Sequence, residues 1–102
     1  MYKTIYKKNK VGNCKWSDAT VFSFHPVKPI TSAEGGMVTT NDGKLAEKIR
    51  RLRDHGASMT DHQRHLGARP YLLADHPYAG FNQRMTDIQA SLGSEQMKRA
   101  QE

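Results

Sequence analysis

Two short runs of apolar and β-branched residues, each followed by turn residues, predict strands in the first half of the chain. Residues 19–24 (A-T-V-F-S-F) are β-branched and aromatic and are followed by two prolines, so they predict a short buried strand. A Gly-Gly pair then precedes a second strand candidate at residues 37–40, and an Asn-Asp-Gly turn closes it. Lys28 therefore lies just beyond the end of the first strand.

The pattern becomes helical after the second strand. Leu45, Ile49 and Leu52 recur at spacings of four and three, with charged residues on the other faces. The Asn-Asp pair before them can cap the first turn, and Gly56 can end the helix. This pattern predicts a surface helix of about four turns.

A long stretch without a clear period separates this helix from a second one. Residues 57–82 are rich in Gly, Pro, His and Asp, and such stretches are usually functional or disordered. Met85, Ile88 and Leu92 then predict an amphipathic helix to about Arg99. Two strands and two one-sided helices form an α/β arrangement with too little apolar surface to close a core. We therefore expect the chain to be part of a larger domain.

The bulk composition excludes several classes of protein. The chain has 102 residues, one cysteine and a net charge of +6. It contains no apolar run near the ~20 residues that span a bilayer, and its basic start has no apolar segment of a signal peptide behind it. A single cysteine forms no internal disulfide and belongs to no cluster of metal ligands. We expect a cytoplasmic protein with no metal and no membrane contact.

The basic charge leaves nucleic-acid binding open as one hypothesis. The lysines and arginines are scattered over the chain, without zinc-finger spacing, a basic region leading into heptads, or a strand with paired aromatic residues. A solvated basic surface explains them better, so we expect no nucleic-acid partner.

Lys28 is the strongest candidate for chemistry. A lone lysine is ordinarily a solvated surface charge, but this one directly follows a buried strand and is held between Pro26 and Pro29. A lysine amine attacks an aldehyde only in its uncharged form, which desolvation or nearby positive charge favours. A rigid strand end provides the placement that such a nucleophile needs.

The segment around Lys28 resembles a known family of enzymes. S-F-H-P-V-K-P-I-T-S-A-E-G-G-M-V-T-T-N-D is similar to the cofactor-lysine segment of the DegT/DnrJ/EryC1/StrS family of pyridoxal-phosphate-dependent nucleotide-sugar aminotransferases. The segments W-S-D-A-T-V-F, L-A-E-K-I-R-R-L-R-D-H-G and G-F-N-Q-R-M-T-D-I-Q-A-S-L-G resemble the same family in the same order. The resemblance thus covers nearly the whole chain.

The resemblance implies both a fold and a set of site residues. Residues 1–102 would be a fragment of the cofactor-binding large domain of fold-type I (aspartate aminotransferase-like) architecture, with no complete second domain. Lys28 would bind pyridoxal 5'-phosphate as a Schiff base and shuttle the proton during transamination. Ser23 would donate a hydrogen bond to the cofactor phosphate, and Asn82 would reach the phosphate of the neighbouring subunit. In the alternative interpretation Ser23 satisfies a strand neighbour and Asn82 caps the last helix.

Five further positions have less specific interpretations. His25 lies near the cofactor or is a packing residue of the turn, and the Gly-Gly pair at 35–36 allows close backbone approach or positive φ after the cofactor loop. Arg84 pairs with a substrate diphosphate or with Asp87. Family members that dehydrate deoxysugars have histidine where this chain has Lys28, so the lysine favours transamination. Phe81 replaces a tyrosine found in many relatives, which leaves packing intact.

Three hypotheses for function follow. The first is an aminotransferase that moves an amino group, usually from glutamate, to a nucleotide-linked keto sugar for surface polysaccharides or antibiotic sugars, as a homodimer. The second is a non-catalytic remnant or oligomerisation partner of that family. The third is a small basic nucleic-acid-binding protein. The resemblance also implies that the aspartate partner of the pyridine nitrogen, the earlier phosphate-binding segment and the small domain lie outside this sequence, so we expect the fragment alone to be inactive.

Overall fold

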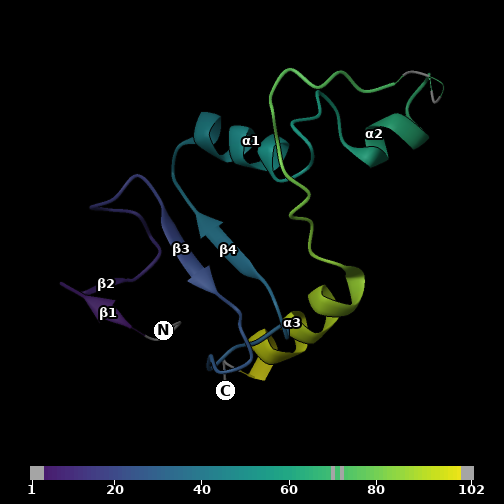
Figure 1. The fold of residues 1–102 in the computed structure, drawn as a ribbon. Coiled ribbons are helices and arrows are strands. Elements are labelled where there is room, and N and C mark those ends of the chain that lie inside the picture. The colour runs from purple at the N-terminus through teal and green to yellow at the C-terminus, as the bar shows by residue number, and fades with distance from the viewer. Residues whose placement is uncertain (1–3, 70, 72, 100–102) are drawn as a thin grey trace. The chain divides into compact units, whose positions relative to one another are not determined.

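The structure, a computed structural model, describes residues 4–69, 71 and 73–99 in two compact units. One unit comprises the described residues up to Gly43 and from Met85 onward, and the other spans Lys44–Arg84. The first unit contains β1 (Ile5–Tyr6), β2 (Asn9–Lys10), β3 (Thr20–Ser23), β4 (Gly36–Thr39) and α3 (Asp87–Arg99). The second contains α1 (Gly43–Leu52), which starts at the boundary, and α2 (Asp61–Leu66) (Figure 1).

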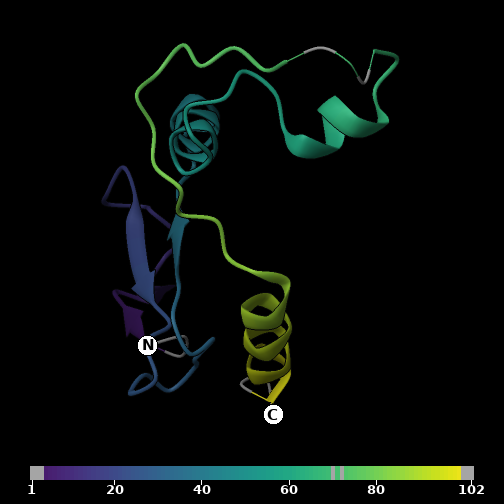
Figure 2. The same ribbon diagram turned by 45° about the vertical axis from the view of Figure 1, so that its right-hand side comes forward.

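The two predicted strands form an antiparallel pair. β3 and β4 align Thr20 with Thr39 and Ser23 with Gly36. Both ribbon views show β3 running into a loop and β4 returning from it (Figure 1, Figure 2). The prediction of two strands is confirmed, and the loop between them carries Lys28. The prediction that the first strand is buried is wrong, because no residue of β3 is buried and Val21 is 73% exposed.

A small hairpin of β1 and β2 precedes this pair and was not predicted. Ile5 is opposite Lys10, and the turn between the strands consists of Lys7 and Lys8 at positive φ values of 46° and 65°. The sequence lacks the Asn-Gly or Gly-X signal that normally marks such a turn, so no pattern indicated it. After the hairpin, the Thr39 hydroxyl donates a 2.8 Å hydrogen bond to the Gly12 carbonyl, which ties this segment to β4.

The predicted C-terminal helix is confirmed as α3. Its first turn is closed by a reciprocal cap, in which Gln89 N–H donates to the Thr86 hydroxyl and Thr86 N–H donates to the Gln89 side-chain oxygen. Thr86 therefore caps this helix, and the alternative of an Asn82 cap is wrong. Asn82 instead forms an antiparallel β-bridge with Asp54 in the Lys44–Arg84 unit.

Helix α1 confirms the helical pattern but is shorter than predicted. It ends at Leu52, after about three turns. His55 and Gly56 then adopt positive φ values of 58° and 71°, and Gly56 N–H donates to the Arg51 carbonyl. A Cβ on Gly56 would lie 2.0 Å from the Tyr78 carbonyl oxygen, so only glycine allows this close approach. Gly56 therefore lies in a turn that follows the last residue of α1, and it does not end the helix directly.

Residues 57–82 contain a second element that the sequence analysis missed. The short helix α2 begins after Thr60, whose hydroxyl accepts from Gln63 N–H while the Gln63 side chain accepts from Thr60 N–H. The Thr-x-x-Gln spacing was the available signal, but a six-residue helix gives no apolar period. The remaining described residues of this stretch are irregular, as predicted.

The buried core is very small. Among the residues that the structure describes, only Ile30, Ser32 and Gly56 are buried, and Ile30 is the one large hydrophobic residue among them. Val21, Phe81 and Ile88 are 64–82% exposed. This agrees with the expectation that these elements cannot close a core by themselves. No helix in the described part of the chain is long and apolar enough to cross a bilayer.

Candidate functional site

The loop between β3 and β4 (residues 24–35, the Lys28 loop) is fixed at its base by a single residue. Phe24 N–H donates to the Gly35 carbonyl at 2.8 Å, and the Phe24 carbonyl accepts from Ser32 N–H at 3.1 Å. The same carbonyl accepts from the Thr31 hydroxyl at 2.9 Å. Three hydrogen bonds to the backbone of one residue hold the two ends of the loop together.

The end of the loop depends on glycine, as the Gly-Gly pair predicted. Gly35 has a φ of 153°, and a Cβ at this position would lie 2.5 Å from the Ser32 hydroxyl and 2.7 Å from Met85 Cε. Ser32 is fully buried and donates a 2.8 Å hydrogen bond to the Glu34 carbonyl. The packing leaves no room for a side chain at residue 35.

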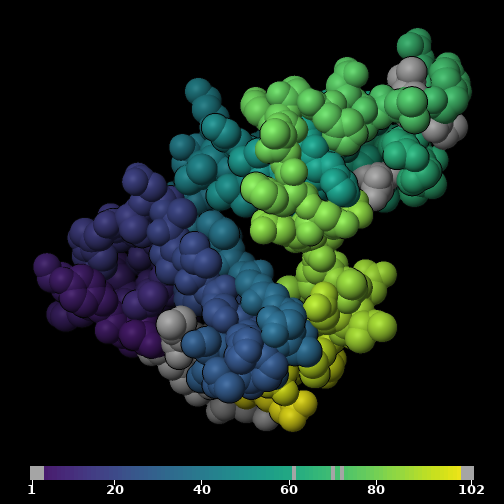
Figure 3. All heavy atoms as spheres, in the orientation of Figure 1, coloured from purple at the N-terminus to yellow at the C-terminus, as the bar shows by residue number. Residues whose placement is uncertain are grey.

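Helix α3 supports the loop from outside. A Cβ on Gly93 would lie 3.4 Å from Ser32 Cβ, which places the middle of α3 directly against the buried serine. The space-filling view shows the blue atoms of the loop against the yellow atoms of α3 (Figure 3). The small residues at 32 and 93 permit this close packing.

A tight turn presents Lys28. Lys28 N–H donates to the His25 carbonyl at 2.9 Å, and His25 N–H donates to the Ser23 hydroxyl at 3.3 Å. His25 Nε2 lies 3.9 Å from Glu34 Oε1, a separation that allows an ion pair when the imidazole is protonated. Ser23 therefore satisfies a neighbour, as its alternative interpretation required, yet its own hydroxyl hydrogen remains available to a further acceptor.

Lys28 and Ser23 line one cavity, which we call the lysine cavity. It has a volume of about 630 Å³ and lies between the end of β3, the Lys28 loop and the segment after β2. Its walls are mainly apolar, with Phe22, Phe24 and Ile30 among them. The structure thus brings together two of the three predicted site residues.

Lys10 also lines this cavity and was not singled out from the sequence. It ends β2, the strand of a hairpin for which the sequence gives no signal. An ammonium group here adds positive charge near Ser23 and Lys28, which favours an anionic ligand.

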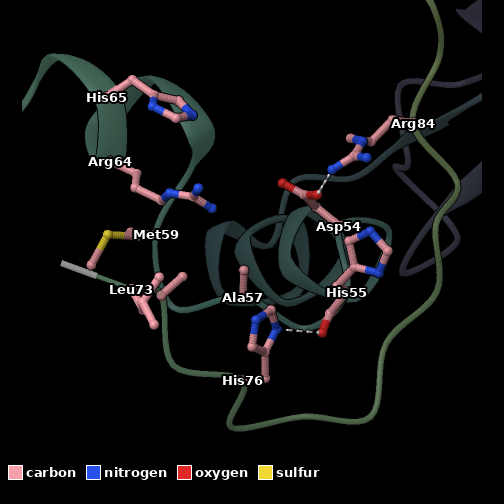
Figure 4. A pocket seen from close by; sticks show the side chains of 10 residues that line it. Asp54, His55, Ala57, Met59, Arg64, His65, Leu73, His76 and Arg84 are labelled. Atoms are coloured by element: carbon pink, nitrogen blue, oxygen red, sulfur yellow. Dashed lines mark hydrogen bonds and ion pairs between the residues drawn. The ribbon is translucent and has the colours of Figure 1, made fainter. Parts of the chain in front are cut away.

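The third predicted residue, Asn82, belongs to the Lys44–Arg84 unit. It is exposed and forms the bridge to Asp54, while the next residue, Gln83, donates from its N–H to the Arg53 carbonyl at 2.8 Å. The backbone around Asn82 is therefore fixed by these contacts, and the Asn82 side chain is accessible to solvent. Arg84, for which Asp87 was one expected partner, donates to Asp54 Oδ1 at 2.6 Å (Figure 4).

The residues of the lysine cavity fit pyridoxal phosphate. The cofactor needs an amine for its aldehyde, hydrogen-bond donors or cations for its phosphate, and apolar walls for its ring. Lys28, Ser23 and Lys10 supply the first two requirements, and the phenylalanines supply the third. No group of three or more His, Cys, Asp or Glu side chains within the described residues could hold a metal ion.

A titrating thiol lies at the base of the β3–β4 pair. Hydrogen bonds with the hydroxyls of Thr20 and then Thr39 lower the pKa of Cys14 below its usual value, against an opposing effect of burial. Cys14 Sγ donates to the Thr39 carbonyl at 3.1 Å when it is protonated. Cys14 therefore contacts both strands of the pair from which the Lys28 loop extends.

Comparisons with known proteins show the family to which the chain belongs. The sequence profile of the DegT/DnrJ/EryC1/StrS aminotransferase family matches residues 2–102. The UDP-4-amino-4,6-dideoxy-N-acetyl-beta-L-altrosamine transaminase of Helicobacter pylori is 41% identical over 95 residues, covering 93% of this chain and 22% of the relative. The GDP-perosamine synthase of Caulobacter vibrioides is 42% identical over 97 residues, covering 95% of this chain and 23% of the relative.

A solved structure supports the same relationship. PseC of Helicobacter pylori, an aminotransferase involved in the biosynthesis of pseudoaminic acid, superimposes with a TM-score of 0.78 at 40% identity, over 95% of this chain and 23% of that protein. The predicted α/β fold class, part of the large domain of fold-type I transferases, is confirmed by this match. The chain spans about a quarter of the length of the relatives that it matches.

Proposed function

Since the chain belongs to the DegT/DnrJ/EryC1/StrS aminotransferase family, we propose that it supplies the cofactor lysine of an enzyme that transaminates a nucleotide-linked keto sugar. The observation that carries this proposal is the lysine cavity, where Lys28 and Ser23 meet within apolar walls. In this proposal residues 1–102 are part of a cofactor-binding large domain. The amino donor is an amino acid such as glutamate, and the product serves amino-sugar biosynthesis.

Pyridoxal phosphate, when bound, supplies an aldehyde for covalent attachment and a ring that accepts electrons. Lys28 would hold the cofactor through Nζ, and its amine, when free, would accept and return a proton during the transfer. The turn from His25 to Lys28 fixes the backbone of this lysine, whose side chain lines the cavity. The apolar walls would pack against the cofactor ring.

Ser23 and Asn82 hold the cofactor phosphate in this proposal. The Ser23 hydroxyl accepts from His25 N–H, which orients its oxygen and leaves its hydrogen for a phosphate oxygen. The exposed Asn82 amide donates to the phosphate of a second subunit, which makes the working form a homodimer. With a single cysteine in the chain, the proposed location is the reducing cytoplasm.

Borohydride trapping tests the lysine assignment. The full chain is mixed with a substoichiometric amount of pyridoxal phosphate, its absorbance is recorded, and the adduct is reduced and mapped by peptide mass spectrometry. We expect the label on Lys28 in large excess over Lys48, an exposed residue of α1 that serves as the internal control. Equal labelling of both lysines would contradict the proposal, as would unchanged labelling of the chain in the Lys28→Ala variant.

The same experiment separates the enzyme from a non-catalytic relative. A remnant that only assembles with another subunit has no need of a selective amine, so it would label its lysines according to exposure alone. Ser23→Ala should weaken cofactor binding about tenfold, because one hydrogen bond to a charged phosphate contributes roughly 1.5 kcal/mol. Family membership favours the enzyme over the third hypothesis, a small nucleic-acid-binding protein.

A further inference from the structure

The β1–β2 hairpin and the segment after it carry a group of lysines that the proposed function does not use. Residues 4–17 contain four lysines and no Asp or Glu. The ammonium groups of Lys7 and Lys15 lie over aromatic rings, at 5.4 Å and 5.1 Å from the ring centroids. Lys8 is exposed in the turn of the hairpin. Lys10 is the member of this group that lines the lysine cavity.

The segment after β2 attaches the hairpin to the wall of this cavity. A Cβ on Gly12 would lie 2.6 Å from Phe22 Cζ, so the backbone at residue 12 packs directly against this ring. The Gly12 carbonyl accepts a 2.8 Å hydrogen bond from the Thr39 hydroxyl. Asn13 N–H in turn donates to the Lys10 carbonyl at 3.2 Å. The backbone of Lys10 is therefore linked to residues of both β3 and β4.

The hairpin itself has little stability of its own. Its strands pair over two residues each, and an isolated hairpin is at best marginally stable in water. Both turn residues, Lys7 and Lys8, have positive φ values, which are unfavourable for residues other than glycine. Ile5, the partner of Lys10 in the register, is 65% exposed. A ligand that contacts Lys10 would therefore add substantially to the stability of the hairpin.

The phosphate of the proposed cofactor requires a cation. A phosphate monoester carries about −1.5 to −2 charges at pH 7, and its transfer from water is costly without a counterion. Ser23 supplies a neutral hydroxyl, and the amine of Lys28 is committed to the aldehyde while it holds the cofactor. Among the described residues that line the cavity, Lys10 is the only other charged one. It is therefore the cation available to this phosphate.

We propose that Lys10 is the counterion of the cofactor phosphate, and that phosphate binding in the lysine cavity thereby stabilises the β1–β2 hairpin. The Ser23 hydroxyl binds a phosphate oxygen from the end of β3, and the Lys10 ammonium neutralises the phosphate from the end of β2. This role of Lys10 rests on the proposed function, because it takes pyridoxal phosphate as the ligand. It adds a coupling between the cofactor and a hairpin that precedes the Lys28 loop in the chain.

Pyridoxine 5'-phosphate is the probe for this role, because it has the ring and the phosphate but no aldehyde that could react with Lys28. Titration calorimetry on the full chain at low ionic strength measures its affinity. Pyridoxine, which lacks the phosphate, is the comparison ligand. Lys10→Gln should weaken pyridoxine phosphate about tenfold, since it removes a charge-assisted contact, and should leave the affinity for pyridoxine unchanged.

Two further variants separate the local contact from other effects. Lys8→Gln removes the same charge from an exposed lysine of the same hairpin outside the cavity, so it should leave both affinities unchanged. Lys10→Arg retains the charge and should retain most of the affinity for pyridoxine phosphate. Circular dichroism checks that the three variants keep the secondary structure of the unmodified chain.

Amide hydrogen exchange tests the coupling to the hairpin. Val11 N–H donates to the Thr4 carbonyl at 2.9 Å, so its exchange rate reports on the pairing of the two strands. Pyridoxine phosphate at saturation should slow this exchange in the unmodified chain and in Lys8→Gln. The same ligand at saturation should have no such effect in Lys10→Gln, and pyridoxine should have none in any of these chains.

Several results would contradict this role of Lys10. These are no saturable binding of pyridoxine phosphate, equal effects of the two glutamine variants, an arginine variant as weak as Lys10→Gln, or slowed exchange of Val11 in Lys10→Gln. Any of them together with selective borohydride labelling of Lys28 would remove the role of Lys10 and leave the proposed function intact. Affinity for pyridoxine phosphate that depends on Lys10, without selective labelling of Lys28, would support the phosphate contact and remove the proposed function.

Discussion

The Lys28 loop is closed by hydrogen bonds to the single residue Phe24, whereas the described residues of the segment 57–80 are held by contacts between distant positions. In the loop, every closing bond spans at most twelve residues of chain. In the segment, Ser58 N–H donates to the Asp75 carbonyl, and Gly56 approaches the Tyr78 carbonyl. The comparison teaches that two regions of one chain can be stabilised differently: local hydrogen bonds close the Lys28 loop, while contacts between distant positions hold the segment 57–80.

The largest expected effect is at the long-range contact. Gly56→Ala places a Cβ 2.0 Å from the Tyr78 carbonyl oxygen at a φ of 71°, so it should destabilise the Lys44–Arg84 unit by at least about 3 kcal/mol. Amide hydrogen exchange of α1 and α2 measures this effect. Gly43→Ala is the control, because a Cβ there meets nothing within 4 Å and alanine favours the helix. If the amides of α1 and α2 exchanged equally slowly in the two variants, the contact between Gly56 and Tyr78 would not be what holds this unit together.

The next effect concerns the local loop. Gly35→Ala forces a Cβ against the Ser32 hydroxyl at a φ of 153°, which should cost about 1–3 kcal/mol and lower the selectivity of labelling at Lys28. Gly93→Ala, on the other side of Ser32, makes an ordinary 3.4 Å contact and should stabilise α3 by about 0.5–1 kcal/mol. Thermal unfolding and borohydride trapping of both variants check the pair. An unchanged labelling pattern in Gly35→Ala would show that the loop is less rigid than its hydrogen bonds indicate.

The two capping threonines give a smaller and more selective effect. Thr60→Ala and Thr86→Ala each remove a cap worth about 1 kcal/mol. The six-residue α2 should lose its protection throughout, whereas the thirteen-residue α3 should fray only at its start. Residue-level hydrogen exchange distinguishes these results.

The smallest effect is the pH response of Cys14. Hydrogen bonds with Thr20 and Thr39 lower the pKa of its thiol in the folded chain, so the folded state binds fewer protons than the unfolded state between the two pKa values. Stability should therefore rise slightly with pH across that window, and the gain is lost as pH falls through the folded pKa. The rate of alkylation by iodoacetamide against pH measures the shift, and Thr20→Val should move the profile upward. An identical profile in the variant would exclude the Thr20 hydroxyl as the cause.

Much of the fold was predictable because local patterns encode it. The β-branched run of β3, the Gly-Gly pair before β4 and the apolar periods of α1 and α3 each reflect one element and its neighbours. The hairpin of β1 and β2 was missed because lysines occupy its turn. The short helix α2 was missed because its only signal is the Thr60–Gln63 spacing.

Part of the candidate site was likewise predictable from the sequence, and part was not. Lys28 and Ser23 are five residues apart at the end of one strand, so sequence reasoning could place them together, and the cavity contains both. Lys10 joins them through a hairpin that has no sequence signal. The close approach of Gly56 to Tyr78 was invisible in the sequence, because no spacing along the chain records this contact.

The closure of the Lys28 loop at Phe24 also has a kinetic consequence. Loops of about ten residues close within roughly 10–100 ns, far faster than the assembly of distant segments. The three hydrogen bonds at Phe24 can therefore form early on the folding pathway, before any contact of high sequence separation is established. The turn that carries Lys28 would then form transiently in a nascent chain and become stable only when α3 packs against Ser32.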